Sequence, residues 1–310
     1  MVPIELEVYG FSLPSRMSCS TAFGFSFDEV VRYHRLTNAQ DKRRVLDLYL
    51  DNFARHHISP YNPAPLDPFG VSWNGSQPVF DWTAWDRAMQ RAIDHYGFNS
   101  FRLPLAGLGG GDYAHRRQPT LNGASENDPR YEVFLQRYLQ SIEAHLADRG
   151  WLDEAFVYFF DEPQPQDYAF VNRGFAKLAR HAPTLRRMLT EQVEEALLGG
   201  PTIWCPLTPH FDDKNAQSRR AAGESFWWYI CTLPKEPYAG LFIDRPGLEL
   251  RTWLWQTWQH NVDGILIWQS NYWHSEAAYA NGRQNPYQDP MRDRKSTRLN
   301  SSHQIISYAV

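Results

Sequence analysis

The sequence predicts an α/β protein whose main domain, residues 1–291, folds as a (β/α)8 barrel of the TIM type. Three observations support this fold class. Strand-like and helix-like patterns alternate along the chain, with eight strand-like runs in total. The most apolar run ends on two adjacent carboxylates, as expected at the mouth of a parallel barrel. The first strand–helix connection, residues 12–37, lacks the glycine fingerprint typical of the rival doubly wound sheet.

Eight apolar, β-branched or aromatic runs of strand length form the predicted barrel. The run 156–160 is apolar throughout, which is typical of a parallel strand buried on both faces. The runs 57–59 and 186–190 have the weakest patterns. In chain order, the predicted strands span residues 4–11, 57–59, 99–103, 156–160, 186–190, 202–207, 225–232 and 264–268.

Helical periodicity and capping residues define the segments between the strands. Asn38 is a predicted N-cap, and so is Asp128, which precedes a proline in the first-turn position. Gly97 and Gly150 are predicted to end their helices, as glycines often do. The predicted helices span residues 39–56, 81–96, 129–149, 166–181 and 246–260.

Two long connections, residues 60–79 and 104–127, follow the second and third predicted strands. Long loops in a compact domain usually form lids or binding walls, or are disordered. In a barrel both stand on the same rim as the two carboxylates, which favours a walled substrate site. The glycine-rich stretch 107–111 does not have the spacing of a phosphate-binding loop, so we expect a mobile loop there.

Composition excludes several classes of function. The net charge is −4, so nucleic acid is not an expected partner, and no apolar run is long enough to span a membrane. Cys19, Cys205 and Cys231 are far apart and odd in number, and we expect them to be small buried hydrophobic residues. The histidines show no ligand spacing, so we expect neither a metal nor another cofactor.

The two ends of the chain differ from the rest. No signal peptide is recognisable, and the chain begins almost directly in a predicted strand, so we expect a piece of a longer protein and infer no localisation. Residues 292–310 differ in composition from the preceding sequence, which is rich in aromatic residues, proline and glycine. They resemble a translated cloning or adapter sequence, and we expect a non-native tail.

The acid pair Asp161–Glu162 is the strongest functional signal. Pro163 prevents the strand from continuing, which leaves both acids at its carboxyl end. Two adjacent carboxylates raise one another's pKa, which suits acid/base chemistry. The alternative is a surface turn whose acids only cap the next helix. The 12 Trp and 16 Tyr residues offer flat apolar faces suited to sugar rings.

Several motifs together resemble the catalytic domain of glycoside hydrolase family 123 and the related DUF4091 proteins, from residue 2 to about residue 290. The resemblance implies a retaining β-N-acetylgalactosaminidase with a glycan substrate, and a β-sandwich domain ahead of the barrel that is missing here. Relatives continue beyond Tyr287, which implies that the barrel is incomplete at its C-terminus. The motifs are Phe11-Ser12-Leu13-Pro14, Phe160-Asp161-Glu162-Pro163, Trp227-Trp228-Tyr229, Arg251-x-Trp253-x-Trp255, and Gly264-Ile265-Leu266-Ile267-Trp268 with Asn271 and Trp273.

The resemblance implies substrate-assisted catalysis. Glu162 matches the general acid/base, and Asp161 matches the residue that orients the substrate's 2-acetamido group. The acetamido oxygen then replaces a carboxylate nucleophile, which is a recognised exception to the two-carboxylate scheme. Further candidate substrate-binding residues are Arg102, Trp228, Tyr229, Trp268, Asn271 and Trp273. Because strand side chains alternate, only one of Trp228 and Tyr229 is expected to face the barrel interior.

Two other functions remain open. One is a conventional retaining glycosidase with Glu162 as acid and a separate nucleophile, for which Glu191, Glu236 and Asp244 are candidates. The other is a non-catalytic carbohydrate-binding barrel whose acids only hydrogen-bond a glycan. The sequence does not distinguish GalNAc from GlcNAc linkages.

Overall fold

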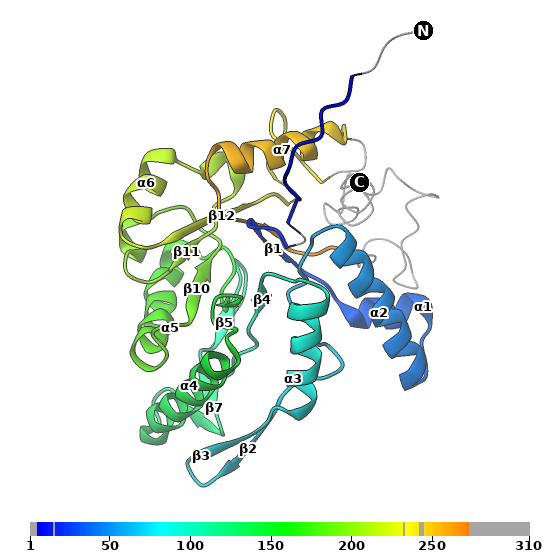
Figure 1. The fold of residues 1–310 in the computed structure, drawn as a ribbon. Helices are drawn as coiled ribbons and strands as arrows, with labels where there is room; N and C mark the ends of the chain where they lie inside the picture. The colour runs from blue at the N-terminus through cyan, green and yellow to red at the C-terminus, as the bar shows by residue number, and fades with distance from the viewer. Residues whose placement is uncertain (1–4, 15, 232, 242–244, 273–310) are drawn as a thin grey trace, which may run out of the picture.

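A computed structural model describes residues 5–14, 16–231, 233–241 and 245–272. Its centre is a parallel sheet of seven strands that curves into a barrel (Figure 1). The strand order is β1-β13-β12-β11-β10-β9-β4, so the chain winds around the barrel in sequence order. The strands are β1 Ser20–Phe23, β4 Phe101–Arg102, β9 Ala155–Val157, β10 Arg186–Leu189, β11 Ile203–Trp204, β12 Ser225–Tyr229 and β13 Gly264–Ile267.

An irregular segment completes the barrel between β1 and β4. Phe23 forms an isolated parallel bridge with Pro60. The backbone N–H of Tyr61 donates to the carbonyl of Phe23 at 2.7 Å, and the Arg102 N–H donates to the carbonyl of Tyr61 at 2.9 Å. This segment therefore occupies the eighth strand position, slightly later in the chain than the predicted strand 57–59. The predicted barrel class is confirmed.

Helices cover the outer face of the barrel (Figure 1). The predicted caps are present: the side chains of Asn38 and Asp128 accept backbone N–H groups, and Gly150 adopts the left-handed conformation. The helix after Trp82 continues into a π-helical turn, Arg91–His95. The α-helices are α1 Phe27–His34, α2 Ala39–Arg55, α3 Thr83–Gln90, α4 Pro129–Arg149, α5 Tyr168–His181, α6 Asp213–Ala221 and α7 Leu248–Gln259.

The prediction of a first strand over residues 4–11 is wrong. Residues 5–14 form no strand in the structure, and their apolar side chains face solvent, with Leu6 82% and Leu13 85% exposed. The first strand is instead β1, because residues 20–23 hydrogen-bond along β13 from Gly264 to Ile267. An alternating pattern cannot become a strand without a neighbour to supply the ladder.

Both long loops contain unpredicted hairpins. The first holds β2 Gly70–Asn74 and β3 Gln77–Asp81, and the second holds the short pairs β5–β6 and β7–β8. The glycine-rich stretch is not a free loop: it supplies β5 Gly110–Gly111, which pairs with β6 Arg116–Arg117. The remaining pair consists of β7 Thr120–Leu121 and β8 Ala124–Ser125.

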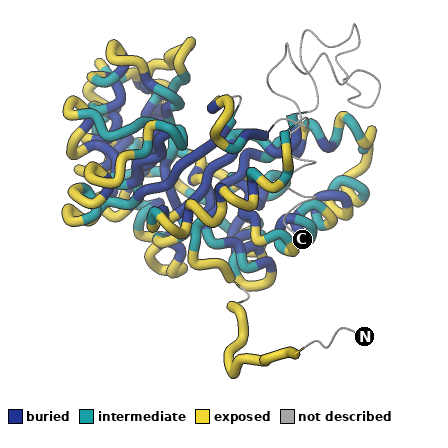
Figure 2. The backbone as a smooth tube through the Cα atoms, turned by 90° about the horizontal axis from the view of Figure 1, so that it is seen from above, coloured by how far each residue is buried: buried dark blue, intermediate teal, exposed yellow. Residues whose placement is uncertain are grey.

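Alternation along the strands separates two kinds of core. Side chains such as Phe156, Trp227 and Tyr229 point into the barrel and form one cluster. Their neighbours point outward and pack beneath the helices, so the strands are buried on both faces. Figure 2 shows buried residues, in dark blue, along the central strands. Cys205 is fully buried in the interior cluster. None of the helices in the described ranges has the length and apolar character that crossing a bilayer requires.

Candidate active site

The acid pair lies beyond the carboxyl end of β9. Phe160 forms a parallel bridge with Gly111, and the Asp161 N–H donates to the Gly111 carbonyl at 2.9 Å. These contacts keep the chain extended past the last residue of β9. At Glu162 the backbone turns into the left-handed region, with φ of 45°. This conformation is uncommon for a residue with a side chain and occurs preferentially at functional sites.

The carboxylate of Asp161 receives two hydroxyl donors on the same oxygen. Tyr158 and Thr190 both donate to Oδ1, the Thr190 bond having a length of 2.9 Å. Thr190 is buried and lies directly after β10. Burial, and next the charge of Asp161, raise the pKa of Tyr158 well above its usual range, so this phenol remains a donor.

The side chain of Glu162 is paired with Tyr229 across the barrel. The Tyr229 hydroxyl donates to Oε1 at 2.5 Å, and Glu162 is half-buried. Burial is the largest influence on the Glu162 carboxyl and raises its pKa; the Tyr229 hydrogen bond lowers it, and the charge of Asp161 raises it again. The net direction is upward, which favours a carboxyl group that carries a proton.

Tyr229, and not Trp228, is the residue of β12 that faces the site. Trp228 points to the outside of the barrel, where its indole N–H donates to Thr257 Oγ1 of α7 at 3.0 Å. It belongs to the cluster between the sheet and the helices and is only 3% exposed. The expectation that Trp228 forms a wall of the sugar site is therefore wrong, because alternation along the strand places it in the core.

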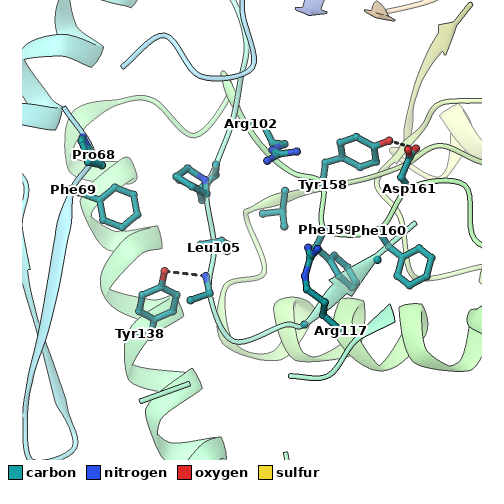
Figure 3. Close-up of a pocket in the computed structure, with 16 residues that line it drawn as sticks. Pro68, Phe69, Arg102, Leu105, Arg117, Tyr138, Tyr158, Phe159, Phe160 and Asp161 are labelled. Atoms are coloured by element: carbon teal, nitrogen blue, oxygen red, sulfur yellow. Dashed lines mark hydrogen bonds between the residues drawn. The ribbon is translucent and has the colours of Figure 1, made fainter. Parts of the chain in front are cut away.

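A cavity of about 500 Å³ opens beside Asp161. Figure 3 shows Arg102 and Tyr158 on the same side of it as Asp161, with Phe69 and Tyr138 opposite. Its volume falls within the range of small-molecule sites. The walls come from β4 and β9 and from both long loops, as the loop lengths predicted. The remaining lining residues are Pro68, Leu103, Pro104, Leu105, Ala106, Gly109, Gly111, Arg117, Val157, Phe159 and Phe160.

Arg102 is the second candidate that the structure brings to this cavity. It is the last residue of β4, and its side chain is exposed. The guanidinium carbon lies 5.6 Å from the centre of the Tyr61 ring, a cation–π geometry.

Asn271 anchors a turn and does not face the acid pair. Its side chain accepts the Ser26 N–H at 2.9 Å and donates to the Ser26 carbonyl at 2.8 Å. It is 2% exposed, and its contact with a sugar stays a prediction. Trp268 is half-buried next to Tyr272, with ring centres 5.2 Å apart. Trp273 lies outside the described residues, as does the tail 292–310.

Sequence reasoning missed Tyr158 and Thr190. Both were available as signals: Tyr158 is the one residue with a hydroxyl group in the run 156–160, and Thr190 ends the predicted strand 186–190. A polar group at the carboxyl end of a barrel strand indicates a role at the site.

The alternative nucleophiles differ in position. Glu191 follows Thr190 on the same rim, and burial, assisted by Glu194 and Glu162, raises its pKa to about 7 although the Gln192 N–H opposes this. Glu236 is 79% exposed at its side chain and paired with Arg245 at 3.0 Å. Asp244 lies outside the described residues. Within the described part of the chain, no group of three potential metal ligands occurs.

A parallel barrel with a carboxyl pair at the carboxyl ends of its strands, one acid shifted toward its protonated form, has the architecture of a barrel glycosidase. The catalytic-domain profile of glycoside hydrolase 123 matches residues 71–299. The chain belongs to glycoside hydrolase family 123.

A solved structure of the same family supports the fold. A family 123 glycoside hydrolase from Clostridium perfringens, described in a study of glycolipid glycan hydrolysis, aligns with a TM-score of 0.58 and 15% identity over 84% of this chain and 51% of its own. This chain therefore spans about half the length of that enzyme. The endo-1,4-β-D-mannanase of Thermotoga petrophila aligns with a TM-score of 0.45 and 11% identity over 94% of this chain and 99% of its own. No curated protein matches the sequence significantly.

Proposed function

We propose that this domain removes terminal β-linked N-acetylhexosamine, most specifically N-acetylgalactosamine, by substrate-assisted retaining catalysis. The observation that carries the proposal is the different environment of two adjacent acids. Asp161 accepts hydrogen bonds from two hydroxyl groups, whereas the Glu162 carboxyl has a raised pKa, as suits a proton donor.

In the first step, the acetamido oxygen of the substrate attacks its own anomeric carbon. The bond from that carbon to the glycosidic oxygen breaks, and Glu162 gives its proton to the departing oxygen. Asp161 accepts a hydrogen bond from the acetamido N–H and stabilises the positive charge of the resulting oxazolinium ring. The nucleophile comes from the substrate, so the protein needs only these two consecutive acids.

In the second step, water attacks the anomeric carbon from the side that the leaving group vacated. The Glu162 carboxylate takes a proton from this water, and the bond between the anomeric carbon and the acetamido oxygen breaks. Two inversions give net retention. Glu162 ends protonated, as it began.

Two further residues support binding in this scheme. Tyr229 holds the Glu162 carboxyl in place through its hydroxyl proton. Arg102 offers guanidinium donors to sugar hydroxyls in the cavity next to Asp161. N-acetylgalactosamine is proposed as the sugar because of the family; the Clostridium perfringens relative is described for glycolipid glycans.

The test is an assay of the full chain with 4-nitrophenyl β-glycosides of GalNAc, GlcNAc, galactose and glucose. We expect turnover of N-acetylated sugars only, and a loss of at least about 100-fold in kcat for Glu162→Gln and for Asp161→Asn. Glu236→Gln is the matched control, because it also removes a carboxylate from the protein, but an exposed one. We expect this variant to stay active. Turnover of plain galactoside or glucoside that survives Asp161→Asn would refute the mechanism.

A further inference from the structure

We infer that Thr190 is a positioning residue that sets the geometry of both acids at once. Its hydroxyl bonds to both acidic residues: it donates to Asp161 Oδ1 at 2.9 Å and accepts the backbone N–H of Glu162 at 2.9 Å. The inference rests on the proposed function for its catalytic consequence, but its structural part can be tested separately.

The direction of each hydrogen bond follows from counting protons. The Glu162 N–H can only donate, so Thr190 Oγ1 must be its acceptor. A threonine hydroxyl has one proton, and of the two oxygens in reach Asp161 Oδ1 at 2.9 Å is nearer than the Tyr158 hydroxyl at 3.2 Å. The Tyr158 hydroxyl gives its own single proton to the same Oδ1. With both protons assigned to Oδ1, neither hydroxyl has a proton to donate across the 3.2 Å that separates Tyr158 from Thr190.

This arrangement determines which oxygen of Asp161 is available. Two donors occupy Oδ1, and within the described residues no protein group donates to Oδ2. Both hydroxyl groups come from side chains held in the barrel wall, so they fix the orientation of the carboxyl group. Oδ2 is then the oxygen that remains free to accept the N–H of an acetamido group.

The second bond acts on the backbone of Glu162. This residue holds φ at 45°, a conformation that costs energy for a residue other than glycine. With its N–H fixed on Thr190 and its carboxyl on Tyr229, the residue is held at both ends. Thr190 is 3% exposed, so water does not readily replace its hydroxyl.

The deciding variants are Thr190→Val, which keeps the shape and removes the hydroxyl, and Thr190→Ser, which keeps the hydroxyl. Thr257→Val is the matched control. Thr257 is also buried, at 4% exposure, and its hydroxyl accepts from the Trp228 indole at 3.0 Å and donates to the Trp253 carbonyl at 2.8 Å. Its loss removes an equivalent pair of bonds at a place remote from the acids.

The structural readout is a crystal structure of each variant. In Thr190→Val we expect Glu162 to leave the left-handed region and to lose its contact with Tyr229, whereas Thr190→Ser and Thr257→Val keep both. An unchanged acid pair in Thr190→Val would overturn the inference, whether or not the enzyme is active.

The kinetic readout is kcat and kcat/KM with 4-nitrophenyl β-GalNAc. For Thr190→Val we expect kcat/KM to fall on the order of 10- to 100-fold, because the Asp161 carboxylate and the Glu162 backbone each lose a hydrogen-bond partner. Thr190→Ser should restore the wild-type value, and Thr257→Val should not change it. An equal loss in Thr257→Val, or no recovery in Thr190→Ser, would overturn the catalytic part. An inactive wild type with a displaced acid pair in Thr190→Val would instead refute the proposed function and retain the positioning role.

Discussion

The hydroxyl of Tyr229 lies 2.5 Å from Oε1 of Glu162, although 67 residues separate them in the sequence. One residue ends β12 and the other follows β9, on the far side of β10 and β11 in the sheet order. This contact spans the interior of the barrel and joins its two halves at the site. It places a phenol, whose own pKa is raised by burial, against the proposed acid.

Replacing Tyr229 by phenylalanine is expected to shift the pH optimum upward. The Tyr229 hydrogen bond lowers the pKa of Glu162, so its removal raises that pKa further. A general acid works while protonated, and the alkaline limb of kcat/KM should therefore move to higher pH. We also expect kcat/KM at neutral pH to fall on the order of 10-fold, because the carboxyl group is less firmly held.

The measurement is a pH profile of kcat/KM for the wild type and Tyr229→Phe. Tyr131→Phe serves as the control, since the Tyr131 hydroxyl is also buried but donates to the Gly107 carbonyl on the outside of the barrel. A shift of the alkaline limb to lower pH would contradict the assigned direction.

Glu191→Gln is expected to stabilise the protein at alkaline pH. Burial raises the folded-state pKa of Glu191 to about 7, well above the usual range of a glutamate. A carboxyl group whose pKa is raised in the folded state contributes stability below its unfolded-state pKa. This contribution is lost as the pH rises through the folded-state pKa. The variant should therefore match the wild type in Tm near pH 4 and exceed it near pH 8.

The same variant tests the conventional mechanism. A nucleophile must be ionised, and a pKa of about 7 leaves Glu191 only partly so at neutral pH. We expect Glu191→Gln to keep kcat within about 10-fold of the wild type. A loss of several thousand-fold, together with trapping of a glycosyl ester on Glu191, would favour the two-carboxylate mechanism.

Trp228→Phe is expected to destabilise the fold without affecting catalysis. The substitution removes the hydrogen bond to Thr257 and part of an indole that packs 6.1 Å from the Trp253 ring. We expect a decrease of about 2 kcal/mol in the free energy of unfolding, from the lost bond and the cavity together. Urea denaturation gives this value, and kcat/KM should stay within about 2-fold. If the variant kept its stability but bound the sugar less well, Trp228 would have to be assigned to the sugar site.

Arg102→Gln is expected to weaken binding more than turnover. Arg102 lines the cavity beside Asp161 but bonds to neither acid. Loss of hydrogen bonds to sugar hydroxyls should raise KM on the order of 10-fold, with a smaller effect on kcat. The check is a comparison of KM and kcat with 4-nitrophenyl β-GalNAc, with Arg55→Gln on the outer helix α2 as control. An unchanged KM would exclude Arg102 from the sugar site.

The sequence by itself determined much of the architecture. The caps at Asn38, Asp128 and Gly150 act through the nearest few residues, so local chemistry was sufficient to predict α2 and α4. The apolar run before Asp161 was enough to place the acid pair at the carboxyl end of a buried strand. These features depend on spacing along the chain, which a sequence contains in full.

Only the tertiary structure decided the partners across the barrel. Residues 5–14 alternate like a strand but pair with none of the described strands, whereas residues 20–23 have a weaker pattern and pair with β13. Alternation along the strand allows only one of Trp228 and Tyr229 to face the barrel interior. Which of the two side chains does so depends on how the sheet curves. The joint contact of Thr190 with Asp161 and Glu162 arises from the register of β10 against β9, which is fixed by packing over the whole barrel.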